Sequence, residues 1–70
     1  MNAFVEMRKK KGYSQGSVAA TIGVERSTIA KWETNAAKPR VDHLIALSKL
    51  YDCSIGDLLD EALKTAEEEE

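Results

Sequence analysis

Hydrophobic residues recur along most of the chain with the period of a helix, three to four residues, and almost no segment alternates with a period of two. This pattern predicts an all-α fold. The first helix is expected over about residues 2–11, with Phe4 and Met7 facing inward. Three lysines at positions 9–11 suit the negative end of its dipole, and Gly12 suits a left-handed stop.

Two short helices are predicted on either side of Gly23. Ser14 is the expected N-cap of the second helix, which ends at Gly23. Its inward face carries three apolar residues, Val18, Ala19 and Ile22. A third helix follows Glu25 and runs through Thr34. A tight turn containing glycine between two helices of this length is typical of a helix-turn-helix.

The C-terminal half is predicted to add two more helices. A loop at 35–39 contains the only proline, and a fourth helix follows over 41–51. One face of this helix carries Val41, Leu44, Leu47, Ser48 and Tyr51. Ser54 and Asp57 have the spacing of a capping box, which opens a fifth helix containing Leu58 and Leu59. The five helices are expected to form one compact domain over residues 1–63.

The third helix divides into two sides when its residues are placed at intervals of about 100° around the axis. An outward arc of about 140° carries small, polar and basic residues, namely Arg26, Ser27, Ala30, Lys31 and Thr34. The opposite side carries Thr28, Ile29 and Trp32. Such a surface can enter the major groove of DNA and present Arg and Lys to guanine edges. The alternative is an ordinary solvated face, because any amphipathic helix on a protein surface has one.

The formal net charge of −2 argues at first against a nucleic-acid partner, but the charges are unevenly distributed. Residues 1–40 carry eight basic against three acidic side chains, whereas residues 60–70 carry six acidic against one basic. The predicted helix-turn-helix therefore lies in the basic part. Residues 64–70 form an acidic tail, in which Glu67–Glu70 should fray because like charges lie at the negative end of the helix dipole.

Several classes of function lack support in the sequence. The single cysteine, Cys53, excludes an internal disulfide and a cysteine-based zinc cluster, and Cys53 with His43 makes no metal site. We expect no cofactor and, because no catalytic arrangement of side chains is present, no enzymatic activity. No apolar run approaches the ~20 residues of a membrane span, and no signal peptide begins the chain. We therefore expect a soluble cytoplasmic protein that does not bind membranes.

Six motifs agree in order and spacing with one known family. They are Arg8, Ser14-Gln15-x-x-Val18-Ala19, Ile22-Gly23-Val24, Ser27-Thr28-Ile29-x-x-Trp32-Glu33, Lys38-Pro39 and Ser54-Ile55-x-Asp57-Leu58-Leu59. Over roughly residues 3–59 the sequence resembles the Cro/repressor-type, lambda-repressor-like helix-turn-helix family, often called XRE. The resemblance implies a five-helix domain that binds double-stranded DNA as a symmetric homodimer, usually as a prokaryotic or phage transcriptional regulator such as a repressor.

The resemblance also assigns roles to individual residues. It implies contacts to DNA bases for Arg26, Ser27 and Lys31. It implies contacts to DNA phosphates for Gln15, Thr28, Thr34, Asn35, Lys38 and Arg40. Arg8 and Glu33 match a structural salt bridge between the first helix and the end of the third, and Trp32 matches a large apolar core residue.

The sequence departs from the family at three turns. Glu25 replaces the usual hydroxyl residue before the third helix, which weakens the cap and brings a negative charge near the expected phosphates. Thr34-Asn35 replaces the usual Asn-Gly, although asparagine tolerates the left-handed conformation. Arg40 replaces the hydroxyl cap of the fourth helix and adds a cation that can bind phosphate.

The C-terminal half leaves alternatives open. Ile45, Leu50 and Leu63 lie off the main inward face and are either ordinary surface residues or part of a dimer interface. The acidic tail and Glu25 also suit a protein-interaction module, such as an antitoxin or antirepressor, in which the same fold binds a protein partner. A third possibility is that these residues are the DNA-binding part of a longer protein.

Overall fold

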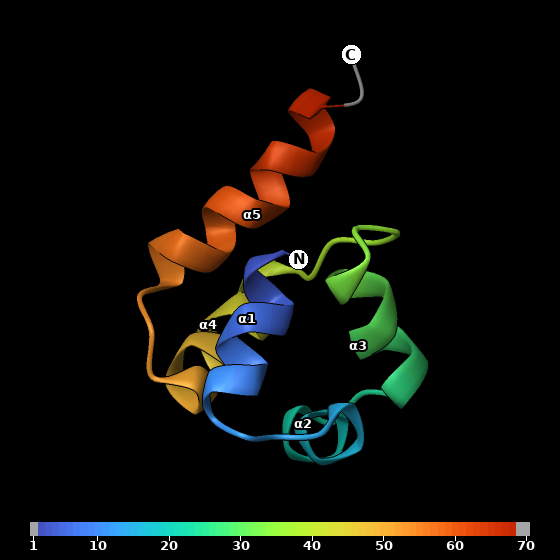
Figure 1. Ribbon diagram of the computed structural model, residues 1–70. Coiled ribbons are helices and arrows are strands. Elements are labelled where there is room, and N and C mark those ends of the chain that lie inside the picture. Colours follow the sequence, from blue (N-terminus) through green and yellow to red (C-terminus); the bar gives the residue numbers. More distant parts are fainter. Residues whose placement is uncertain (1, 69–70) are drawn as a thin grey trace.

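The computed structural model describes residues 2–68, with side chains through Leu63. Within that range it contains five helices and no strand, as the hydrophobic pattern predicted. The helices are α1 (Ala3–Lys10), α2 (Gln15–Ile22), α3 (Arg26–Glu33), α4 (Val41–Tyr51) and α5 (Ile55–Glu68). The first four surround a common core, and α5 crosses α1 and α4 and projects beyond them (Figure 1). The all-α, lambda-repressor-like fold class is confirmed.

Side-chain caps and left-handed residues define the ends of the first two helices. Asn2 caps α1, because its Oδ1 accepts a hydrogen bond of 3.1 Å from the backbone N–H of Val5. Ser14 caps α2, as predicted, by accepting a hydrogen bond from the N–H of Ser17 at 3.0 Å. Gly12 and Gly23 follow the two helices with φ of 75° and 90°, a region that glycine enters without steric cost.

The next two helices begin without a side-chain cap. Glu25 and Arg40 occupy the N-cap positions of α3 and α4, and neither side chain accepts a backbone hydrogen bond there. This agrees with the weak capping expected of both residue types. Ser54 does cap α5, because its Oγ accepts a hydrogen bond of 3.2 Å from the N–H of Asp57.

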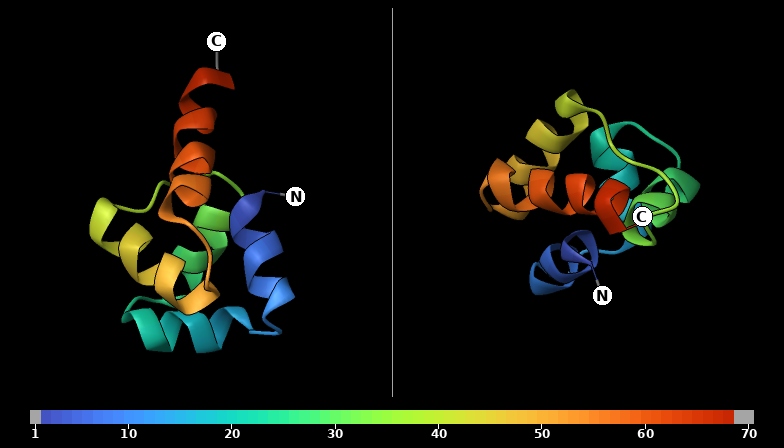
Figure 2. Two further views of the ribbon diagram at one scale, coloured as in Figure 1. Left: turned by 90° about the vertical axis from the view of Figure 1, so that its left-hand side faces the viewer. Right: turned by 90° about the horizontal axis from the view of Figure 1, so that it is seen from above.

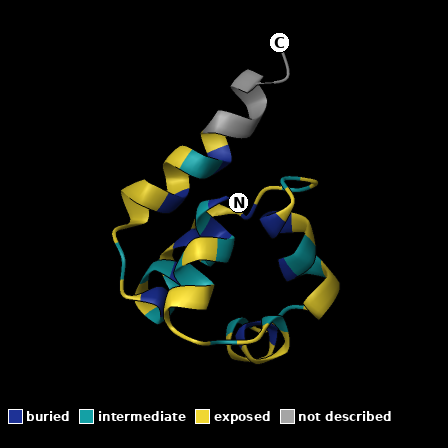
Figure 3. Ribbon diagram, viewed as in Figure 1, coloured by how far each residue is buried: buried dark blue, intermediate teal, exposed yellow. Residues whose placement is uncertain are grey.

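The core draws side chains from all five helices. Its buried members, each at most 4% exposed, are Phe4, Val18, Ala19, Ile29, Trp32, Leu44, Leu47, Tyr51 and Leu58. The segments that carry them are dark blue in Figure 3. Burial of one large aliphatic side chain, such as Leu47, contributes about 1.5–3 kcal/mol. Core packing, rather than capping, therefore holds α3 and α4 in place.

Val41 departs from the predicted inward face of α4. It is 64% exposed, whereas Leu44 and Leu47 of the same face are buried. Val41 opens the helix, and the first turn of α4 lies at the edge of the molecule (Figure 2, left), where no other helix covers it. The prediction that Val41 faces inward is therefore wrong, because the helical period does not show how far the neighbouring helices extend.

The backbone of α5 continues to Glu68, beyond the domain boundary expected at residue 63. Side chains from residue 64 onward and the last two residues of the run Glu67–Glu70 lie outside the described part of the chain. The acidic tail at 64–70 and its fraying therefore stay predictions. No helix among the described residues combines the length and apolar character needed to cross a membrane.

Candidate nucleic-acid interface

The helices α2 and α3 pack directly against each other and are joined by a short turn. The N–H groups of Gly23 and Val24 both donate to the carbonyl of Ala19, at 2.8 and 3.0 Å, which reverses the chain tightly after α2. The carbonyl of Glu25 then accepts the first hydrogen bonds of α3, from Thr28 and Ile29. The predicted helix-turn-helix is thus formed by residues 15–33.

The two sides of α3 differ as the period of the sequence predicted. Ile29 and Trp32 are buried in the core, where they fix the rotation of the helix about its own axis. Arg26, Ser27 and Lys31, the three residues assigned to base contacts, are all exposed on the other side. Buried apolar anchors therefore hold a small, polar and basic face toward solvent.

A buried carboxylate joins α3 to the first two helices. Glu33 Oε2 accepts a hydrogen bond of 2.6 Å from Arg8 Nε, and Glu33 Oε1 accepts one of 3.1 Å from Arg8 Nη2. The two side chains are only 12% and 4% exposed, and Arg8 Nη1 also donates to the carbonyl of Tyr13 at 2.8 Å. The hydrogen bond to Glu33 raises the pKa of the Arg8 guanidinium above its ordinary value. The structure thus places the assigned salt-bridge pair in contact.

Gln15 is held by the same carboxylate. Its Nε2 donates to Glu33 Oε1 at 2.9 Å, so the end of α3 fixes the orientation of the first side chain of α2. The next residue is Gly16, which has no side chain. Arg26 Cδ lies 3.9 Å from the position that a β-carbon of Gly16 would occupy. Arg26 therefore leans over the first turn of α2, which brings together two residues assigned to DNA contacts.

The loop after α3 carries the remaining residues assigned to phosphate except Thr28, which lies on α3 itself. Thr34 and Asn35 are already engaged within the protein: the Thr34 hydroxyl donates to the carbonyls of Ala30 and Lys31, at 3.1 and 3.3 Å. Asn35 adopts a φ of 63°, the left-handed turn that its residue type permits. Thr28, the last of the polar residues in this set, is half-buried.

Two cations of this loop are exposed. Lys38 takes part in no ion pair among the described residues, and Arg40 Nε lies 4.0 Å from Asp42 Oδ1. Both follow α3 directly, and in Figure 1 the loop lies above the end of that helix. Exposed positive charge thus continues from α3 into the loop, as binding to a phosphate backbone requires.

Asn2 is a buried polar residue that the sequence patterns missed. It is 8% exposed, and its Nδ2 donates both to the carbonyl of Trp32 at 2.9 Å and to Asn35 Oδ1 at 3.1 Å. Asn35 in turn donates to Glu61 Oε2 at 3.4 Å, and Glu61 Oε1 accepts from the N–H of Ala3 at 2.9 Å. This network fixes the loop that carries Lys38. An asparagine directly before an apolar helical run was the available signal, because it is a common N-cap.

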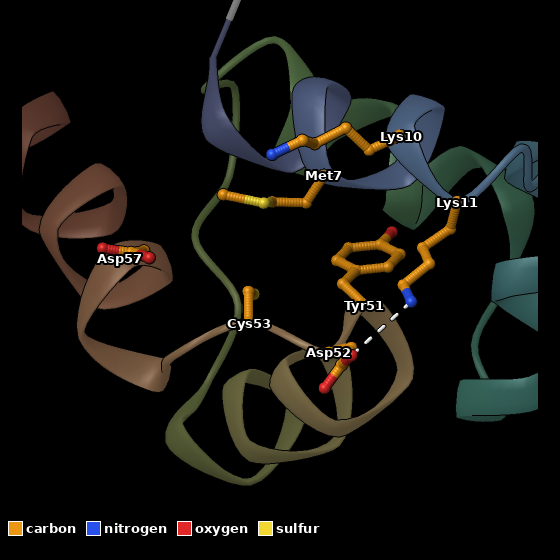
Figure 4. Close-up of a pocket in the computed structure, with 7 residues that line it drawn as sticks. All are labelled: Met7, Lys10, Lys11, Tyr51, Asp52, Cys53 and Asp57. Atoms are coloured by element: carbon orange, nitrogen blue, oxygen red, sulfur yellow. Dashed lines mark ion pairs between the residues drawn. The ribbon is translucent and has the colours of Figure 1, made fainter.

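A cavity lies apart from the helix-turn-helix, between the end of α1 and the junction of α4 and α5 (Figure 4). Its walls are Met7, Lys10, Lys11, Tyr51, Asp52, Cys53 and Asp57. Burial, together with the negative charge of Glu33, raises the pKa of the Tyr51 phenol to about 12. Burial also raises the pKa of the Cys53 thiol, which favours its protonated form. The described residues contain no cluster of three metal-ligating side chains here or elsewhere.

Comparison with known proteins agrees with this helix-turn-helix geometry. A family model described as helix-turn-helix matches residues 5–58, most of the chain. The chain belongs to the XRE-type helix-turn-helix family. This family comprises regulators rather than enzymes. Its defining motif here is the α2–α3 pair, and the matched region ends at Leu58, within the first turns of α5.

Three curated relatives share about a third of their residues with this helix-turn-helix protein. The transcriptional regulator AnsR of Bacillus subtilis is 32% identical, with 84% of this chain and 51% of AnsR covered. The regulator SinR of the same organism is 36% identical, with 86% and 55% covered. Repressor protein C2 of Salmonella phage P22 is 36% identical, with 74% and 24% covered. The chain thus spans about half or less of the length of these relatives. No solved structure matches it.

Proposed function

We propose that the protein is a transcriptional regulator, repressor-like in action, that binds double-stranded DNA with α3 in the major groove. The observation that carries this proposal is the exposed face of Arg26, Ser27 and Lys31 on a helix whose opposite side is buried. The family and the names of the relatives, which are transcriptional regulators and a phage repressor, support it. Its place of action would be the cytoplasm of a prokaryotic cell, where the DNA lies.

The three exposed residues of α3 have complementary roles in base recognition. Arg26 and Lys31 donate to guanine N7 and O6, and Ser27 can donate or accept. A good bidentate pair between Arg26 and guanine contributes on the order of 1–3 kcal/mol of discrimination. Ala30, between them, is small enough to let the helix approach the bases closely.

Contacts to phosphates come from the elements around α3. Lys38 and Arg40 are the exposed cations of the loop, and each phosphate that they neutralise adds about 0.9 to the salt dependence of binding. Gln15 lies at the N-terminus of α2, which favours an anion through its free N–H groups. Thr28, on α3, and Thr34 and Asn35, directly after it, complete the proposed set.

We further propose a symmetric homodimer on a palindromic operator. On α5, Ile55, Leu59 and Leu63 recur every four residues and are 39%, 39% and 55% exposed, which leaves an apolar stripe uncovered. Ile45 of α4 is 42% exposed, whereas Leu50 packs against the core and is unsuited to the interface. In such a dimer we expect the two α3 helices to enter successive major grooves, about 34 Å apart, which is one turn of DNA.

The same stripe is the observation that favours the second candidate, an antitoxin- or antirepressor-type module with a protein partner. The mass of the purified protein in solution distinguishes the two. A dimer in the absence of any other protein supports self-association, whereas a monomer that dimerises neither alone nor on DNA favours the partner.

Selection of bound duplexes from a random pool tests the function directly. We expect enrichment of a palindromic sequence with half-sites one helical turn apart, and binding to it that weakens steeply with salt. Enrichment of a single, unpaired half-site would refute the proposed dimer but not the proposed DNA binding. Affinity for the selected sequence no better than for random DNA at moderate salt would refute the function.

A further inference from the structure

One exposed charge at the tip of the recognition helix has no part in the proposed contacts. Glu25 is the N-cap of α3, with an extended backbone at φ −81° and ψ 153°. Its carboxylate caps no N–H group of the helix and forms no hydrogen bond or ion pair within the described residues. The side chain is exposed, so its charge contributes to the fold only through a weak, solvent-screened attraction to the N-terminal end of the α3 dipole.

The position of Glu25 places this carboxylate at the end of α3 that reads bases. In helix-turn-helix proteins, the N-terminal residues of the recognition helix contact the base edges. The next residue, Arg26, leans toward α2, with its Cδ 3.9 Å from the β-carbon position of Gly16. Because Arg26 turns toward α2, Glu25 is the exposed polar side chain directly before the first turn of α3.

The chemistry of the major groove decides what an ionised carboxylate can bind there. It is an acceptor only, and the donors in the groove are N4 of cytosine and N6 of adenine. Guanine and thymine present acceptors, which repel it. Adenine presents the acceptor N7 beside its amino group, whereas cytosine presents N4 without an acceptor of its own. A carboxylate in this position therefore prefers cytosine.

We infer that Glu25 is a specificity-determining residue that selects cytosine at one position of each half-site. This inference rests on the proposed function, and it turns the departure of Glu25 from the family pattern into a statement about the operator. Arg26 next to it is proposed to bind guanine, so the tip of α3 carries an acceptor side chain suited to cytosine and a donor side chain suited to guanine. The carboxylate lowers affinity for phosphate in general and contributes selectivity in return.

The test is selection from a random duplex pool with the wild-type protein, Glu25→Gln and Glu25→Ala. The matched control is Asp60→Asn, which removes the same charge from an exposed position on α5. We expect the wild-type protein and the control to prefer cytosine about tenfold at one position of each half-site. Glu25→Gln should move that preference to adenine, which glutamine binds through N6 and N7. Glu25→Ala should lose it, and circular dichroism should show all variants folded.

Two other results would overturn the inference, and they differ clearly from the expected one. If Glu25 merely repels phosphates, both substitutions tighten binding to every duplex by the same factor and select the wild-type sequence, which overturns the inference. If the wild-type protein enriches no sequence at all, the proposed function itself has failed and the inference fails with it.

Discussion

Removal of one member of the buried Arg8–Glu33 pair should destabilise the domain far more than replacement of both. The Glu33 side chain is 4% exposed and accepts hydrogen bonds from Arg8 Nε, Arg8 Nη2 and Gln15 Nε2. Arg8→Met removes the only cation in this set and leaves a buried carboxylate with one neutral partner. At 4% exposure the carboxylate has almost no contact with water in this position.

The expected magnitude is large for a domain of this size. Breaking a buried ion pair by removing one partner costs about 3–5 kcal/mol. Native domains have about 0.05–0.15 kcal/mol of stability per residue, or roughly 4–10 kcal/mol for this chain. Arg8→Met should therefore unfold much of the protein at low concentrations of urea. The double variant Arg8→Met/Glu33→Leu has no buried charge to desolvate, and should recover most of the loss.

Urea unfolding followed by circular dichroism, on the wild type, both single variants and the double variant, measures the coupling directly. Arg40→Met is the matched control, because Arg40 and Asp42 are 84% and 71% exposed and 4.0 Å apart. We expect this control to cost less than about 1 kcal/mol. The reasoning is refuted if Arg8→Met costs no more than the control, or if the two single losses simply add in the double variant.

Three further outcomes follow from the structure. Arg26→Ala should relax sequence preference, whereas Lys38→Ala should weaken binding to all duplexes alike and lower the salt slope by about one; binding titrations at several salt concentrations separate the two. Because burial raises the pKa of Tyr51 to about 12, the neutral phenol is favoured in the folded state. The stability that this gives is complete below pH 10 and is lost between pH 10 and 12, by about 2–3 kcal/mol. Urea unfolding of Tyr51→Phe should show a smaller loss over that range, and an equal loss would contradict the assignment. Asn2→Ala removes the cap of α1 and one of the two hydrogen bonds that the carbonyl of Trp32 accepts, at a cost of about 1–3 kcal/mol, measurable as a lower melting temperature.

Helix boundaries were predictable because the signals that set them are local. Ser14 and Gly23 delimit α2 through hydrogen bonds and a backbone conformation that involve only neighbouring residues. The inward side of α3 was predictable for a related reason, since the helical period alone separates Ile29 and Trp32 from Arg26. The unexpected exposure of Val41 shows the limit, because a period does not reveal which turn a neighbouring helix covers.

The polar contacts between elements were not predictable from residue patterns. Asn2 reaches residues 30 and 33 positions away, and Glu61 binds the N–H of Ala3 from the other end of the domain. No local rule connects such distant positions, because the partners meet only after the core has packed. The Arg8–Glu33 pair was expected from the family resemblance alone. Its hydrogen bond to Gln15, which orients the start of α2, comes from the structure.

The uneven charge of the chain is useful to the proposed function because of where the helices lie. Interactions between exposed charges are screened beyond about 8 Å at physiological salt, so the net charge of −2 does not determine what a given face attracts. Residues 15–40 form one continuous segment and also one region of the surface, α2, α3 and the loop. Because this segment is continuous both in sequence and on the surface, its cations are placed to act together on the phosphate backbone of the proposed DNA partner. The exposed Asp60 belongs to α5, which packs on α1 and α4. Glu25 is the one exposed acid within the segment, which is why its removal should change selectivity rather than simply increase attraction.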